Sequence, residues 1–302
     1  MTLNLESPGA LPALARRIKS DIDDYCVWKY NEGVGRSHLG ASLIGHECSY
    51  YLCLSFRWAH HTVESGRQYR LFQRGHSEEA KIVDLLTGIG CTVKCFDDEH
   101  LEDTHIDKGH RQIRISACKG HFGGSIDGML KLPERFGIPD DVIFLAEMKT
   151  QGVGKKGKNF EELVAKGVKA KKAQHFAQMS IYGYKLGLKY GVYISVCKND
   201  DDIHIEVIKL DWSLGEALER KAGMIIFGET PPSKISMSPA YFTCVYCNML
   251  GVCHNGEPID RNCRSCKNCS PIDNAEWYCG HWNNIIPKEF LIQGCDNWIS
   301  FF

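Results

Sequence analysis

Two short apolar runs, residues 124–132 and 142–149, most limit how this chain can fold, because they place charges inside apolar sequence. Turn-forming residues bound each run and a loop with Pro and Gly separates them, so each run is expected to be a β-strand. The second run, VIFLAEMK, has Glu147 and Lys149 directly after five apolar residues. Burying charges is unfavourable unless they are paired or bound to a metal ion.

The alternation of side chains along a strand predicts which of these groups meet. Residues two apart point to the same face, so Glu147 and Lys149 share a face and Met148 points away. If the two strands pair, Asp127 of the first run joins them. Two carboxylates suit Mg²⁺, which also keeps waters and binds phosphate oxygens, and such an ion supports phosphodiester hydrolysis. Most Asp-Gly pairs are turns and most Glu-x-Lys pairs lie on solvated faces, so these pairs alone do not indicate a metal site. The apolar sequence around them is what favours one.

The other elements order as helices and strands in alternation. We expect helices over residues 9–30, 42–56, 67–86, 173–188 and 212–227, and strands over residues 91–96, 111–117, 191–197 and 203–210. This order predicts an α/β fold, a mixed central sheet flanked by helices. From about residue 231 the composition shifts to Cys, Asn, Pro and Gly. The predicted division is a helical segment (1–37), a core (38–232) and a Cys-rich metal-binding region (233–302).

Composition and charge narrow the setting. The chain has 302 residues, 43% of them hydrophobic, and a net charge of −1. No run approaches the roughly 18 apolar residues of a membrane span, and the start lacks the apolar core of a secretory signal. We therefore expect a cytoplasmic protein without a membrane partner.

A nucleic-acid partner would need a local basic patch, and residues 151–172 offer one. They contain seven lysines and read as a glycine-rich loop passing into a helix. Flexible lysines hold a phosphate backbone without reading sequence; the alternative is a solvated face. The predicted DNA-contacting residues are Lys155, Lys156, Lys158, Lys171 and Lys172.

Four sequence elements together resemble the PD-(D/E)XK nuclease superfamily, in its RecB-like, lambda-exonuclease-like branch. They are Gly75 with Glu79, the segment GSIDG (residues 124–128), EMK (residues 147–149) and QMSIY (residues 178–182). The resemblance covers about residues 38–212 and implies a restriction-endonuclease-like core. Two departures are that His, common in the family at the Glu79 position, occurs here one turn earlier as His76, and that no Pro precedes Asp127.

The resemblance also implies roles for these residues. Asp127 and Glu147 would bind Mg²⁺ or Mn²⁺ with the carbonyl of Met148, and Glu79 would complete the shell directly or through water. Lys149 would orient or deprotonate the attacking water and offset charge on the phosphate. Gln178 and Tyr182, on one stripe of their helix with Gln174, would contact the DNA backbone or brace the site.

Cysteine is unusually frequent, with 15 residues, seven of which lie within residues 244–279. An odd number without a secretory signal argues against a disulfide scaffold. Some RecB-like nucleases hold a 4Fe–4S cluster with one cysteine before the core and three after it. The corresponding residues are Cys48, Cys244, Cys247 and Cys253. The alternative is that Cys48 is a buried apolar residue and that the other three bind zinc with His254.

The remaining cysteines of the tail predict a separate structural Zn²⁺ site. Pairs of cysteines separated by two residues suit tetrahedral zinc, which would stabilise a tail too poor in apolar residues to fold alone. Cys269 and His281 are alternative ligands. The preferred set is Cys263, Cys266, Cys279 and Cys295.

Together these features predict a Mg²⁺- or Mn²⁺-dependent deoxyribonuclease, an exonuclease in preference to an endonuclease, with DNA as its partner. The resemblance adds a role in phage or mobile-element recombination, a recombinase or single-strand-binding partner, and a bacterial or phage-infected cell as the setting. Two alternatives from other classes are a non-catalytic, metal-stapled nucleic-acid- or partner-binding module on a nuclease scaffold, and a redox protein that uses the cluster.

Overall fold

The computed structural model describes residues 6–31, 33, 35–97, 111–153 and 159–302. Its helices are α1 (Ala10–Tyr30), α2 (Ser49–Phe56), α3 (Gly66–Gly88), α4 (Asn159–Lys171), α5 (Ala173–Leu186), α6 (Trp212–Phe227), α7 (Phe242–Val245) and α8 (Leu250–His254). Its strands are β1 (Leu39–Gly40), β2 (Thr92–Lys94), β3 (Phe96–Asp97), β4 (Arg111–Gln112), β5 (Arg114–Ala117), β6 (Phe122–Ser125), β7 (Gly128–Lys131), β8 (Phe144–Gln151), β9 (Tyr190–Cys197), β10 (Ile203–Lys209), β11 (Cys269–Pro271), β12 (Trp277–Cys279) and β13 (Asn284–Ile286).

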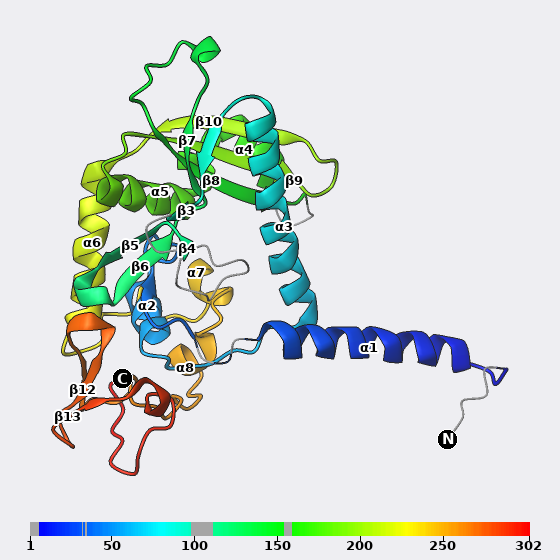
Figure 1. Ribbon diagram of the computed structural model, residues 1–302. Helices are drawn as coiled ribbons and strands as arrows, with labels where there is room; N and C mark the ends of the chain where they lie inside the picture. The colour runs from blue at the N-terminus through cyan, green and yellow to red at the C-terminus, as the bar shows by residue number, and fades with distance from the viewer. Residues whose placement is uncertain (1–5, 32, 34, 98–110, 154–158) are drawn as a thin grey trace.

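A five-stranded sheet, called the central sheet, has the order β10-β9-β8-β7-β2 and lies in the upper part of Figure 1. Strands β8 and β9 are parallel and the other neighbours are antiparallel. A parallel pair needs a long crossover, and α4 and α5 supply it. The prediction of a mixed α/β fold is confirmed.

Helices cover both faces of this sheet because β8 is apolar on both sides. Phe144, Ala146 and Met148 pack with Ile82 and Leu86 of α3. Leu145, on the other face, belongs to the core that contains α5 and α6. The expected alternation of β8 is confirmed, and it sends Glu147 and Lys149 to the α5 side.

The expected single strand over residues 124–132 is wrong. It is two strands, β6 and β7, which belong to different sheets. The chain changes sheets at Ile126 and Asp127, where the Ile126 N–H donates to the carbonyl of Ile113. The expected strand over residues 111–117 divides at Ile113 in the same way, into β4 and β5. Periodicity alone does not reveal such a switch, because both halves keep an extended backbone.

The expected helix over residues 42–56 is also shorter than predicted. Only Ser49–Phe56 is helical, and Cys48 is the N-cap, whose sulfur accepts a hydrogen bond from the Tyr51 N–H at 3.4 Å. The preceding turn passes close to α5: a Cβ on Gly45 would lie 2.7 Å from the Cβ of Ala177. Of the apolar residues before Cys48, Ile44 is therefore buried in a turn and Leu43 is half-buried.

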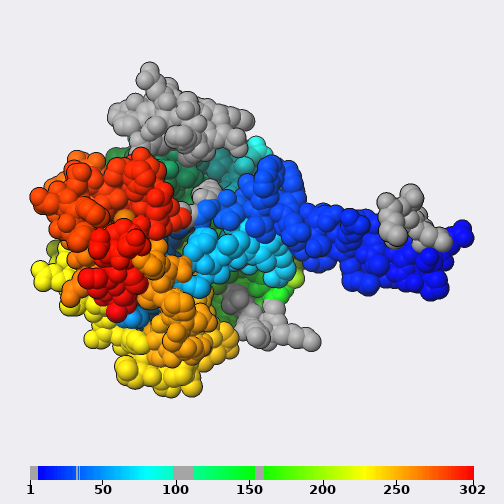
Figure 2. All heavy atoms as spheres, turned by 90° about the horizontal axis from the view of Figure 1, so that it is seen from below, coloured from blue at the N-terminus to red at the C-terminus, as the bar shows by residue number. Residues whose placement is uncertain are grey.

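Helix α1 projects from the body as an arm, as Figures 1 and 2 show. It crosses α3 where Gly66 permits close approach, since a Cβ there would lie 2.3 Å from the carbonyl oxygen of Asp23. Asp23 also forms an ion pair with Arg70 of α3. In the described part of the chain, no helix is long and apolar enough to cross a membrane.

The Cys-rich tail folds back onto α2 as two short helices and the three-stranded sheet β11-β12-β13. Trp277 of β12 is 1% exposed and its ring lies 5.4 Å from that of Phe56 in α2. The tail and the region before the central sheet therefore share one core.

Candidate functional site

Asp127, Glu147 and Lys149 meet where β7 begins beside β8, the middle strand of the sheet, and are called the carboxylate–lysine cluster. The Lys149 Nζ lies 2.6 Å from Glu147 Oε1 and 3.3 Å from Asp127 Oδ2. It also donates to the carbonyl of Met148 at 3.0 Å. The ammonium thus contacts the oxygens of three residues predicted to bind a metal ion.

Local backbone structure holds Asp127 in this cluster. The residue lies between β6 and β7, and its Oδ2 accepts a hydrogen bond from the Met148 N–H at 2.7 Å. Gly128, the next residue, pairs with Ala146 of β8. The Asp-Gly pair is therefore the point at which the chain returns to the central sheet after β6.

Burial decides the protonation of the carboxylates. Glu147 is completely buried, and burial raises its pKa to about 7, with Asp127 adding repulsion and Lys149 opposing the rise. Burial and the charge of Asp127 also raise the pKa of Glu79, on α3, to about 7. Burial opposes the charge of Lys149, but Glu147 and Asp127 raise its pKa above the ordinary range. The site therefore has more acidic groups than its one ammonium can balance.

Gln178 and Tyr182 lie on the α5 face that covers the sheet, and both are buried. The amide of Gln178 donates to Glu147 Oε2 at 3.4 Å. The hydroxyl of Tyr182 donates to the carbonyl of Ser125 at 2.8 Å. Of the two expected roles, contact with DNA or bracing, these contacts are the bracing kind.

Sequence reasoning missed a polar chain beside the cluster. His175 Nδ1 lies 2.8 Å from the hydroxyl of Tyr193, which also accepts from Gln151, and the Lys172 ammonium donates to Gln151 at 2.8 Å. Burial lowers the pKa of His175 to about 3, with Lys149 adding to the effect. The register gives a signal, since Tyr193 of β9 is the partner of Glu147 in β8. A polar residue at that position of an apolar strand faces the same side.

A groove of about 1340 Å³ opens beside the cluster, lined by Met148, Lys149 and Glu79. It runs along α3 past His76. Its other basic lining residues are Lys29, Arg36, Lys198 and Arg261.

The structure describes only part of the predicted lysine patch. Lys155, Lys156 and Lys158 lie outside the described residues. Lys171 forms an ion pair with Glu162 at 2.8 Å, and Lys172 binds Gln151. Contact of these lysines with DNA stays a prediction.

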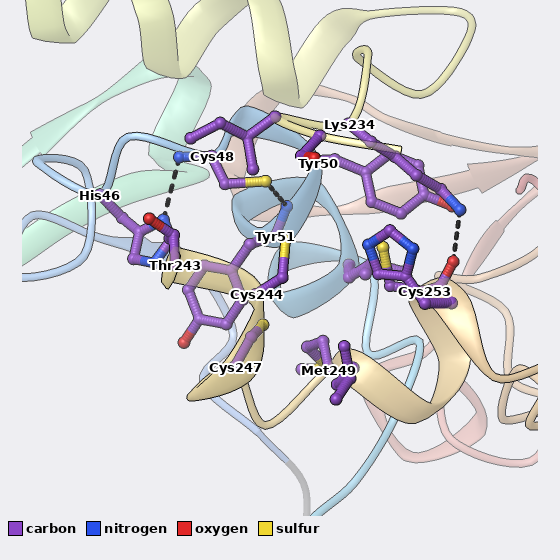
Figure 3. Close-up of a pocket in the computed structure, with 15 residues that line it drawn as sticks. His46, Cys48, Tyr50, Tyr51, Lys234, Thr243, Cys244, Cys247, Met249 and Cys253 are labelled. Carbon is purple, nitrogen blue, oxygen red and sulfur yellow. Dashed lines mark hydrogen bonds between the residues drawn. The ribbon is translucent and has the colours of Figure 1, made fainter. Parts of the chain in front are cut away.

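Cys48, Cys244, Cys247 and Cys253 line one pocket between α2, α7 and α8 (Figure 3). The Lys234 ammonium donates to the carbonyl of Cys253 there. His254 lines the same pocket.

The second cysteine set gathers around β11 and β12. Cys269 of β11 lies directly opposite Cys279 of β12 in the antiparallel register. The backbone N–H groups of Cys266 and Cys269 donate to the carbonyls of Cys263 and Cys266, and the Cys263 thiol donates to the carbonyl of Phe290 at 3.6 Å. Cys295 is exposed, and so is His281, whose ring packs against Trp282. Cys269, which was expected only as an alternative ligand, thus lies opposite Cys279, and the choice between Cys269 and Cys295 stays a prediction.

As the side chains are placed, no group of three or more His, Cys, Asp or Glu residues in the described ranges is arranged to hold a metal ion. All predicted ligand sets therefore stay predictions, and each would need its side chains to turn toward a common centre.

No protein-family model matches the chain, and a comparison with curated proteins finds no significant match. Among solved structures, SSO0001 is 14% identical with a TM-score of 0.41, covering 78% of this chain and 96% of the other. LHK-Exo in complex with dAMP is 14% identical with a TM-score of 0.39, and LHK-Exo, an alkaline exonuclease from Laribacter hongkongensis, 16% with 0.35; both cover 63% of this chain and 86% of the other. With TM-scores below 0.5, these similarities carry no inference about activity.

Proposed function

We propose that this chain is a Mg²⁺- or Mn²⁺-dependent nuclease that hydrolyses phosphodiester bonds in DNA. The observation that carries the proposal is that Asp127, from the turn before β7, meets Glu147 and Lys149 of β8 beside a groove. The preference for an exonuclease over an endonuclease, and a role in recombination, come from the sequence resemblance. The metal-stapled binding module without catalysis is the alternative.

The residues present fit a hard divalent cation. The buried Oε1 of Glu147 lies 2.6 Å from Lys149 but without hydrogen-bond geometry, and it has no hydrogen-bond partner in the described ranges. Burial, with the charge of Asp127 adding to it, raises the pKa values of Glu79 and Glu147, and a bound cation would favour their ionised forms. Carboxylates and a carbonyl are the ligands that Mg²⁺ prefers, and one or two carboxylates suffice. Asp127, Glu147 and the Met148 carbonyl would hold the ion, with Glu79 directly or through water.

When bound, the metal ion would activate water and offset negative charge on the phosphate. Once the ion has replaced it as the partner of the carboxylates, the Lys149 ammonium would contact the phosphate or the attacking water. Because neighbouring carboxylates raise the pKa of Lys149, the side chain stays protonated, which suits stabilisation of phosphate charge. Gln178 would hold the Glu147 carboxylate, and Tyr182 would hold the loop that carries Asp127.

The groove supports nucleic acid as the substrate class. Its basic residues, such as Arg36 and Lys198, suit a phosphate backbone. Trp58, Tyr69 and Phe72 also line it and offer faces on which unpaired bases can stack. Positively charged residues beside aromatic faces are the combination found in binding sites for single-stranded nucleic acid.

We also propose that Cys48, Cys244, Cys247 and Cys253 hold the 4Fe–4S cluster, as the resemblance implies. Thiolates are the usual ligands of such clusters, and these four line one pocket. His254 keeps the alternative open, because its buried Nε2 has no hydrogen-bond partner within the described part of the chain. Iron and sulfide analysis after anaerobic purification, with Cys48→Ser and His254→Ala as variants, decides between them. Finding zinc without iron would overturn the cluster.

Digestion of end-labelled linear and closed-circular DNA with Mg²⁺ or Mn²⁺ tests the nuclease. We expect the parent to shorten the linear DNA from its ends, and Glu147→Ala and Lys149→Ala to lower the rate about 100-fold or more, as for other positioned catalytic groups. Glu216→Ala, which removes an exposed glutamate of α6, is the matched control. Cutting of the circle would indicate an endonuclease. An inactive parent, or variants as active as the parent, would leave only the binding module.

A further inference from the structure

Two arginines, Arg57 and Arg264, are buried side by side under the Cys-rich tail and are called the arginine pair. Their exposed fractions are 2% and 0%. Arg57 follows the last residue of α2, and its Nη1 donates to the carbonyl of Arg264 at 3.0 Å. The two guanidinium groups therefore bring two positive charges into one region of the core.

The partners of the arginine pair are neutral. Arg57 also donates toward the carbonyls of Cys266 and Cys269, at 3.5 and 3.3 Å, and Arg264 donates to the carbonyls of Arg36, Ser37 and Phe56. Aromatic rings cover both groups, with the Phe301 ring 3.4 Å from Arg57 and the Trp58 ring 4.1 Å from Arg264. Neither Nε has a hydrogen-bond partner, and no carboxylate pairs with either arginine, among the residues that the structure describes.

This arrangement leaves two like charges without a counter-charge. Guanidinium groups keep their proton in proteins, and a buried charge needs a partner of opposite sign. A negative group is therefore expected close to the pair.

Cysteines adjoin the arginine pair: Cys266 and Cys269 contact Arg57, Cys263 is hydrogen-bonded to Cys266, and Cys279 is the strand partner of Cys269. Arg57 contacts the backbone of Cys266 and Cys269 and interacts electrostatically with both thiols. The Arg264 residue lies between Cys263 and Cys266 in the chain. As neutral thiols they offer no compensation, but as metal-bound thiolates they would.

We propose that Cys263, Cys266, Cys269 and Cys279 bind one Zn²⁺ as four thiolates, and that the resulting charge of −2 compensates Arg57 and Arg264. Each thiol gives its proton to solvent as its sulfur binds zinc, so four negative thiolates and one divalent cation leave two negative charges. The pair supplies two positive charges. The site is distinct from the pocket of Cys48 and from the carboxylate–lysine cluster.

Backbone geometry favours this ligand set. Directly opposed residues of antiparallel strands have Cβ atoms roughly 4.5–5.5 Å apart, and Cys269 and Cys279 are such a pair. Cys263, Cys266 and Cys269 are linked by successive backbone hydrogen bonds of 3.1 and 3.2 Å. The Trp282 N–H already donates to the sulfur of Cys279 at 3.5 Å. Rotation of the thiols toward a common centre completes a tetrahedral site.

The proposed centre would fasten the tail to the core through α2. The helix begins after Cys48 and ends before Arg57, so one cysteine set meets its start and the other meets its end. A structural zinc site contributes directly to folding. This one would hold the tail in place, and the tail also carries Cys244, Cys247 and Cys253.

Metal analysis of the full chain tests the ligand set. We expect one zinc per chain in the parent, loss of that zinc in Cys269→Ser, and full retention in Cys295→Ser. Iron content is measured on the same samples and is expected to be unchanged in Cys269→Ser, which separates this site from the Cys48 pocket. Zinc lost from Cys295→Ser but kept in Cys269→Ser, or a parent without zinc, would overturn the proposal.

Two measurements keep the proposal testable if a variant fails to fold. The parent with Co²⁺ in place of zinc is expected to show the intense sulfur-to-cobalt absorption of a tetrathiolate site, and its absence contradicts four sulfur ligands. Arg57→Met is expected to weaken zinc binding about 10- to 100-fold in competition with a chelator, whereas Arg220→Met, at an exposed arginine, leaves it unchanged. Unaltered affinity in Arg57→Met would refute the charge compensation.

Discussion

The carboxylate–lysine cluster and the arginine pair bury charge of opposite sign. In the first, Asp127 and Glu147 with the neighbouring Glu79 share one ammonium. In the second, two guanidinium groups have carbonyls and aromatic faces as partners. Each region is unbalanced when only its own described side chains are counted.

The difference teaches which ion each region can accept. Excess carboxylate attracts a hard cation such as Mg²⁺. Excess guanidinium beside cysteines favours the ionised thiolates that a soft-ligand metal site needs. Net charge of a buried cluster therefore gives information that ligand spacing does not, and it separates a proposed catalytic metal from a proposed structural one.

The largest effect is expected from removing the cation of the carboxylate–lysine cluster. Lys149→Met leaves Glu147 buried and unpaired, and breaking such a pair costs about 3–5 kcal/mol of unfolding free energy. Urea unfolding of metal-free protein at pH 8 measures it. Lys131→Met is the control, because the Lys131–Asp140 pair of 3.3 Å is exposed and such pairs contribute less than about 1 kcal/mol. Equal losses in the two variants would show that Glu147 does not depend on Lys149.

A second expected effect is a loss of stability of the metal-free protein as pH rises. Glu79 and Glu147 have ordinary pKa values of 4.5 and folded values of about 7. Between these values the folded chain holds protons that the unfolded chain releases, so unfolding free energy falls from pH 4.5 to 7. For the fully buried Glu147 the change is about 3 kcal/mol.

Thermal unfolding at pH 5 and pH 8, with and without Mg²⁺, checks this pH dependence. Bound Mg²⁺ favours the ionised carboxylates, so it should stabilise the protein more at pH 8 than at pH 5. Lys149 does not contribute to this window, because its raised pKa lies above the ordinary value of 10.5. A melting temperature that rises with pH in both conditions contradicts the raised carboxyl pKa values.

The contribution of the arginine pair to stability should be larger with metal bound than without it. Arg264→Met is expected to destabilise the zinc-loaded protein more than the zinc-free protein, by about 1.4–2.7 kcal/mol, which corresponds to a 10- to 100-fold loss of zinc affinity. Unfolding with and without a chelator measures the difference. A loss that is the same in both conditions would mean that the pair does not sense the metal, and the comparison between the two regions would fail.

Sequence patterns predicted most elements of the core, since α3, α6, β9 and β10 are long and periodic. They also predicted that Glu147 and Lys149 share a face and that Asp127 joins them. The switch of Asp127 between two sheets was not predictable, because it depends on close packing of Gly124 against Tyr182: a Cβ on Gly124 would lie 2.5 Å from the Tyr182 hydroxyl. Such a contact is tertiary and leaves no local pattern.

The cysteine sets show the same limit. Spacing separated the upstream set from the tail set, but it could not choose between Cys269 and Cys295. Strand pairing places Cys269 opposite Cys279 and favours it as a ligand, and β11 is too short to be predicted from sequence. The arginine pair was also missed, because Arg57 and Arg264 are far apart in the chain and each is ordinarily a surface residue.

The smallest effect is expected from Tyr182→Phe, which removes the brace on the loop before Asp127. The hydroxyl donates to Ser125 at 2.8 Å, and losing one such hydrogen bond costs about 1 kcal/mol. Urea unfolding of metal-free protein measures it. Gly124→Ala sharpens the result: it should be destabilising in the parent, where the new methyl group meets the hydroxyl, and less so in Tyr182→Phe. If Gly124→Ala costs the same in both backgrounds, then the contact between these residues does not position Asp127, and the bracing role of α5 rests on Gln178 alone.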